Sequence, residues 1–144
     1  MNKIKSLKLF AFISMTALPI VAIADQSYTE KLDQIVLDCK SVSDSKLQAF
    51  NAAQSKHGVG SGEWYSSHQE MKEAVHECIE SGIKSASYIQ RGEIDKYPKA
   101  TTQLTKTYQA WRAYLESLAL DGTGFYEKSY GIAAEDLKTH PHDK

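Results

Sequence analysis

Four side chains near the middle of the chain are of the types that bind metal ions or haem. Glu73 and His76 stand three residues apart, and on a helix this spacing points both side chains the same way, as in carboxylate-bridged dimetal bundles. Such bundles need a second copy of the motif, whereas this pair stands alone, away from the apolar stripe of its segment. His68 and Met71 lie one turn apart in that stripe, and both residue types ligate haem iron. We expect Glu73 and His76 on an exposed helix face, and His68 partly buried beside a turn.

The end of the chain holds a second group of metal-binding residue types, His140, His142 and Asp143. Imidazole and carboxylate ligands suit transition metals, but on a tail of residues 139–144 we expect plain solvated chain. No serine stands in a G-x-S-x-G context, and the glycine-rich stretch 57–62 follows a predicted helix rather than a strand, unlike a phosphate-binding loop. The sequence therefore predicts no catalytic residue, no cofactor and no metal site, and a protein that is not an enzyme.

The N-terminus predicts export. Residues 1–8 carry three lysines and no acid, an apolar run follows from Leu9 to Ile23, and Ala22-Ile23-Ala24 matches a signal-peptidase cleavage pattern. The apolar run of roughly 15 residues is shorter than the roughly 20 needed to cross a bilayer. We expect residues 1–24 to be a cleaved signal peptide, followed by a helical domain at 25–138 and a flexible tail at 139–144. The mature chain has no expected membrane span and belongs in the periplasm or outside the cell.

The charge of the mature chain limits its partners. Residues 1–24 hold three of the 17 basic residues and none of the 18 acidic ones, so 14 basic and 18 acidic residues leave a formal charge of −4. No block of basic residues could neutralise phosphates, which argues against a nucleic-acid partner. A basic protein partner is compatible with this charge.

The spacing of apolar residues predicts helices throughout and no strand. The first helix covers 27–56, where a change of phase at 41–45 allows either a kink or a new start. The second has an apolar stripe over 64–89, begins at Ser61 or Gly62 and ends at Gly92. The third covers 94–118, with Asp95 as its cap, Pro98 in its first turn and Gly122 marking its end. The fourth is short and covers 123–138.

These segments define the fold class. Short connections place consecutive helices antiparallel, so we expect an all-α bundle of three to four helices. In the second helix the residues Gly82, Ser85 and Ala86 are small, which would let another helix approach closely there.

The two cysteines, Cys39 and Cys78, are predicted to form a disulfide. An exported chain meets an oxidising compartment, and both residues lie on apolar helical stripes. In an antiparallel hairpin the midpoint between facing residues falls in the turn, and the midpoint of this pair falls in the glycine-rich stretch 57–62. The same register places Ile35 opposite Gly82. We expect a structural bridge, since no C-x-x-C motif suggests redox catalysis.

Aromatic residues gather in the last third of the chain and suggest a binding surface. Tyrosine and tryptophan are frequent anchors of protein interfaces. Tyr108 and Trp111 fall on the apolar stripe and are expected in the core. Tyr114 falls off that stripe, as does Tyr126 or its neighbour Phe125, so Tyr114 and Tyr126 are the predicted partner-binding residues.

Residues 104–114, with the sequence LTKTYQAWRAY, resemble a helical motif of small periplasmic lysozyme inhibitors. Leu104, Trp111 and Tyr114 fall at matching spacings, and Asp44-Ser-Lys-Leu47 is similar to another stretch of that family. Gln109 is one place out of step, and Leu115 stands where the motif has arginine. The resemblance implies a periplasmic inhibitor and assigns no functional residue.

Together these observations favour an exported helical binding protein, such as an inhibitor or immunity protein of a wall-degrading hydrolase. Two alternatives stay open: a metal or haem carrier that uses His68, Met71, His76 and the His140–His142 tail, and an envelope stress or structural protein with no single ligand. The oligomeric state stays open as well.

Cleavage of the signal peptide predicts a mature protein that begins at Asp25. The intact mass of protein recovered from the periplasm of an expressing bacterium should match residues 25–144. Protein in the membrane fraction that still carries residues 1–24 would show that these residues are an anchor.

Overall fold

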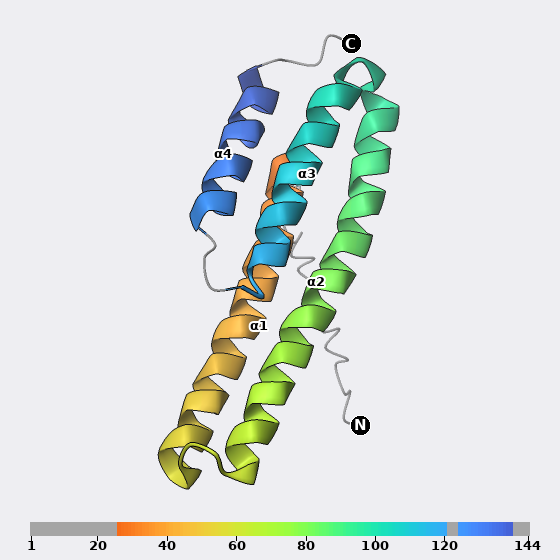
Figure 1. Ribbon diagram of the computed structural model, residues 1–144. Coiled ribbons are helices and arrows are strands. Elements are labelled where there is room, and N and C mark those ends of the chain that lie inside the picture. Colours follow the sequence, from red (N-terminus) through yellow and green to blue (C-terminus); the bar gives the residue numbers. More distant parts are fainter. Residues whose placement is uncertain (1–25, 121–123, 140–144) are drawn as a thin grey trace, which may run out of the picture.

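The computed structural model describes residues 26–120 and 124–139, and nearly all of them lie in helices (Figure 1). The elements in chain order are α1 (Tyr28–His57), α2 (Gly62–Lys96), the short 3-10 helix η1 (Pro98–Ala100), α3 (Thr101–Ser117) and α4 (Gly124–Thr139). Consecutive α-helices run antiparallel, as Figure 1 shows, which confirms the predicted all-α bundle. The predicted signal peptide, the predicted helix end at Gly122 and residues 140–144 of the predicted tail lie outside the described residues.

Helix α1 begins with a capping box that the spacing analysis missed. The backbone N–H of Glu30 donates to Ser27 Oγ, and the Glu30 carboxylate accepts from the backbone N–H of Ser27 at 2.7 Å. These contacts lower the pKa of the Glu30 carboxyl group. The helix then runs unbroken through residues 41–45, so the change of phase there is neither a new start nor an end.

The turn between α1 and α2 is made by glycine. Gly58 and Gly60 both have φ of +85°, a backbone conformation that L side chains rarely adopt. Ser61 then caps α2 by accepting from the backbone N–H of Trp64 at 3.1 Å. The predicted turn and the predicted start of the second helix are confirmed.

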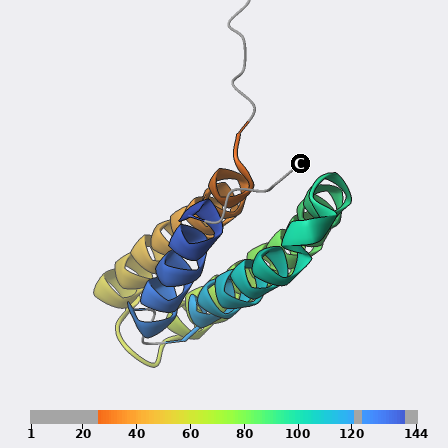
Figure 2. The same ribbon diagram turned by 90° about the horizontal axis from the view of Figure 1, so that it is seen from above.

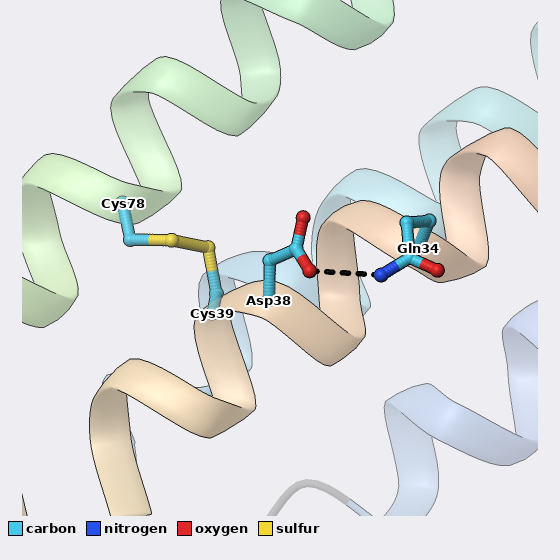
Figure 3. Close-up of a disulfide and its surroundings, with 4 residues drawn as sticks. All are labelled: Gln34, Asp38, Cys39 and Cys78. Carbon is cyan, nitrogen blue, oxygen red and sulfur yellow. Dashed lines mark hydrogen bonds between the residues drawn. A yellow bond between two sulfur atoms is a disulfide. The ribbon is translucent and has the colours of Figure 1, made fainter. Parts of the chain in front are cut away.

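Cys39 and Cys78 form the predicted disulfide, which joins α1 to α2 with their Cα atoms 5.6 Å apart (Figure 3). The predicted register also holds away from the bridge. A Cβ atom placed on Gly82 would lie 2.7 Å from Ile35 Cγ2 and 3.2 Å from Leu115 Cδ2. Gly82 therefore faces Ile35 and receives α3 at the same point.

The predicted start of the third helix, at residue 94, is wrong. Helix α2 continues through Gly92 and Asp95 to Lys96, so neither residue ends or caps a helix. The chain breaks at Tyr97, whose φ of −130° and ψ of 67° are not helical. A residue that precedes proline is disfavoured in the helical region, so Pro98 places the break here.

Helices α3 and α4 complete a core with the first part of α1 and the last part of α2. Figure 2, seen from above, shows α1 and α4 on one side and α2 and α3 on the other. Trp111 is fully buried, and its Nε1–H donates to the carbonyl oxygen of Leu32 at 2.9 Å. Tyr130 on α4 donates its hydroxyl to Asp33 Oδ1 at 2.8 Å. Burial, together with Asp33, raises the pKa of Tyr130.

The remaining part of the α1–α2 hairpin extends beyond α3 and α4. Figure 1 shows the hairpin running past the start of α4 and the end of α3 to its glycine turn. Leu118, which directly follows α3, lines a pocket together with Ser43 of α1 and Val75 of α2, so we call residues 43–75 the lower hairpin. In the described part of the chain, no helix is both long enough and apolar enough to span a membrane.

The close approach at Gly82 gives a test of the helix packing. Alanine normally stabilises a helix interior by about 0.5–1 kcal/mol relative to glycine. At Gly82 the added methyl group meets the Cγ2 methyl group of Ile35, so Gly82→Ala should instead lower the free energy of unfolding by about 1–3 kcal/mol. Urea denaturation followed by circular dichroism measures the change.

Gly92 is the matched control, because it lies in the same helix with nothing within 4 Å of an added Cβ atom. Gly92→Ala should raise the free energy of unfolding by about 0.5–1 kcal/mol. Stabilisation of both variants would contradict the close contact between Gly82 and Ile35.

Candidate functional site

One stripe of residues along each helix of the hairpin forms a groove that receives α3. On α1 the stripe comprises Leu32, Val36, Cys39, Ser43, Leu47 and Phe50. On α2 it comprises Ala86, Gly82, Ile79, Val75, Met71, His68 and Trp64. Successive members are three or four residues apart, which keeps them on one face of each helix. The groove continues past the end of α3 as a pocket beside Leu47 and Met71, and the two stripes extend beyond it to Phe50 and Trp64.

The stripe changes from buried to accessible where α3 ends. Leu32, Val36 and Cys39 are buried on α1, but Leu47 is 44% exposed. On α2 the stripe residues Ala86, Gly82, Ile79 and Val75 are buried. The next three stripe residues, Met71, His68 and Trp64, are only partly buried. We call Leu47, Phe50, Trp64, His68 and Met71 the groove face.

A pocket lies at the junction between α3 and the groove face. Its cavity volume is about 450 Å³. Leu118, Ala119 and Leu120 form one wall, and Leu47, Met71 and Val75 form the other. Leu120 is 64% exposed, so this apolar hollow is open to solvent. An open apolar hollow with a few polar groups at its edge is the usual form of a binding site.

Aromatic rings cover the other end of the groove face, near the glycine turn. The ring centroid of Phe50 lies 5.6 Å from that of Trp64 and 5.4 Å from that of His68. His68 stacks on Trp64 with an angle of 11° between the rings. Tyr65, 62% exposed, extends the cluster at 4.9 Å from Trp64. The partial burial predicted for His68 is confirmed, and its ring neighbours are aromatic rather than metal-binding.

Lys72 and His76 stand along the α2 edge of the pocket. Among the described residues Lys72 has no ion pair, whereas His76 Nε2 lies 3.1 Å from Glu80 Oε1. On the α1 side the pocket is lined by Ser43 and Leu47 of the stripe. The α2 edge of the pocket therefore carries the positive charge of Lys72.

The predicted metal-binding residue types are not brought together. Glu73 accepts from Gln69 Nε2 at 2.7 Å, while His76 pairs with Glu80, and both lie on the exposed helix face that the sequence predicted. Within 26–120 and 124–139, no three His, Cys, Asp or Glu side chains are grouped as metal ligands. His140, His142 and Asp143 lie outside the described residues.

The exposure expected for Tyr114 is wrong. Tyr114 is 4% exposed, stacks on Tyr130 with ring centroids 6.1 Å apart, and donates its hydroxyl to Glu127 Oε1 at 2.9 Å. One apolar stripe marks the face of α3 that packs on the hairpin, whereas α4 covers a second face of α3 that includes Tyr114. Tyr126 is 37% exposed beside Phe125, as expected for one of this pair.

Comparison of the chain with family models, with curated proteins and with solved structures finds no match. Within residues 104–114, the three positions that resemble lysozyme inhibitors, Leu104, Trp111 and Tyr114, are all buried in α3. These three residues are thus packing residues, whereas Leu47, in the second similar stretch, is 44% exposed.

The two tyrosines predicted as binding residues should behave differently when truncated. Tyr114→Ala removes a buried aromatic ring and should lower the free energy of unfolding by about 3–5 kcal/mol. Tyr126→Ala removes a partly exposed ring and should change it by less than about 1 kcal/mol. Thermal denaturation of both variants measures the difference, and equal losses would contradict the burial of Tyr114.

Proposed function

We propose that this chain is an extracytoplasmic binding protein whose groove face docks on another protein. The observation that carries the proposal is the continuation of the groove past the end of α3. The same stripe that buries α3 runs on through Leu47, Phe50, Trp64, His68 and Met71, where no described residue of α3 or α4 covers it. Aromatic residues and methionine are enriched at protein interfaces, and the part of these side chains that is still exposed would be removed from water by a partner.

The disulfide supports this role because it makes the lower hairpin stiff before a partner arrives. Cys39 and Cys78 join the two helices close to the level at which α3 ends. A surface that is already ordered loses less conformational entropy on binding, which leaves more of the interaction energy as affinity. The projecting half of the hairpin is thus a preorganised binding element.

For the partner we propose a basic wall-degrading hydrolase, with this chain as its inhibitor or immunity protein in the periplasm. Residues 1–24 have the pattern of an export signal, and residues 25–144 carry a formal charge of −4, with 14 basic against 18 acidic residues. Opposite net charges accelerate association. The disulfide suits an oxidising compartment.

The proposal is tested by binding of the mature protein to purified envelope hydrolases, measured by calorimetry together with inhibition of wall lysis. Leu47→Asp and Met71→Asp each place a charge in the groove face and should weaken binding at least about tenfold, which corresponds to about 1.4 kcal/mol. Ile132→Asp is the matched control, because Ile132 is 64% exposed on α4.

Failure of every envelope hydrolase to bind at micromolar concentration would contradict the hydrolase as partner. Binding that Leu47→Asp and Ile132→Asp weaken equally would contradict the groove face as the docking surface. Thermal denaturation of each variant establishes that the substitutions act on binding rather than on folding.

A further inference from the structure

The groove of the hairpin already holds one helix in its upper part. Helix α3 lies in it through Trp111, whose indole N–H reaches the Leu32 carbonyl, and through Leu115, which approaches Gly82. Leu118 follows at the next position of the same stripe and ends in the pocket beside Leu47 and Met71. The upper groove is thus an established seat for an amphipathic helix, and α3 stops partway along it.

The lower part of the groove has the same construction as the upper part. Residues spaced three or four apart on α1 and α2 again form its walls. These walls adjoin the pocket at Leu47 and Met71, which line both. A third helix packs between two neighbouring helices by setting its side chains into their grooves. The stretch from Ser43 to the end of α1 at His57 is roughly 20 Å long, which accommodates about 14 residues of helix.

The edges of the lower groove indicate the charge of its occupant. On the α2 edge Lys72 has no ion pair among the described residues, whereas His76, one turn further along, already contacts Glu80. On the α1 edge the exposed residues that flank the stripe are Gln48, Asn51 and the acidic Asp44. A carboxylate on the occupant would be attracted at the α2 edge and repelled by Asp44 at the α1 edge.

We infer that the partner supplies one amphipathic α-helix of about 14 residues, which lies in the lower groove in line with α3 and carries its acidic residues on the side of Lys72. This inference rests on the proposed function and specifies the element of the partner that is bound. In the lower groove the apolar stripe of the bound helix takes the position that the stripe of α3 has in the upper groove. It covers Leu47, Met71 and the rings of Phe50, Trp64 and His68.

Two synthetic helical peptides test the inference on the full mature chain. Both have leucines at a spacing of three and four residues, and a hydrocarbon staple on the outer face holds them helical. One carries glutamates at the positions that flank the stripe on one side, and the other carries lysines there. Fluorescence anisotropy should show the glutamate peptide binding at least tenfold more tightly than the lysine peptide.

Variants of the chain then locate the bound peptide. Lys72→Glu should reverse the preference between the two peptides, and Leu47→Asp should reduce binding of both at least tenfold. Ile132→Asp should change neither. The absence of saturable binding by either peptide, or binding that Leu47→Asp leaves unchanged, would overturn the inference.

Two further outcomes separate this inference from the proposed function. A hydrolase that binds and is sensitive to Leu47→Asp, while neither peptide binds, would leave the proposed function standing and overturn the helix. Peptide binding with the expected charge preference, while no hydrolase binds, would support the helix and contradict the hydrolase as partner. A dimer in sedimentation experiments that Leu47→Asp dissociates would place a second copy of the chain in the groove and overturn the inference.

Discussion

The disulfide between Cys39 and Cys78 fixes which residues of α1 face which residues of α2, and the groove exists only in that register. A slip of one residue would rotate both stripes away from each other. Ile35 faces Gly82 in this register, and the absence of a side chain at Gly82 leaves room for Leu115. The seat of α3, and with it the place of α4, therefore follows from the pairing of the first two helices.

The unequal lengths of the helices leave part of the hairpin uncovered. Helix α1 has 30 residues and α2 has 35, whereas α3 has 17 and α4 has 16. The shorter pair covers only part of the hairpin, so the same apolar stripe is core in one half and accessible surface in the other. The lower hairpin keeps its helices without a third layer because the disulfide and the ring contacts of Phe50 with Trp64 and His68 hold it.

Helical spacing predicted the hairpin well because its signals are local. The glycine turn and the capping serine Ser61 follow from neighbours in sequence, and the midpoint of the two cysteines, 39 residues apart, then gives the register of the hairpin. The break at Tyr97 was missed because the stripe from Ile94 to Leu118 keeps its spacing across Pro98, and spacing alone does not detect a change of direction. Tyr114 and the groove face were missed because burial depends on where α3 and α4 begin and end in space.

The central claim is that the lower hairpin stands on its own two-helix interface and the disulfide, while the upper half has the support of α3 and α4. Hydrogen exchange of the Cys39→Ser/Cys78→Ser double variant tests it most directly. If loss of the bridge costs about 3 kcal/mol, amide protection in residues 43–57 and 64–75 should fall by roughly 100-fold. Protection in α3 should fall less. An equal or smaller loss of protection in the lower hairpin would contradict the account.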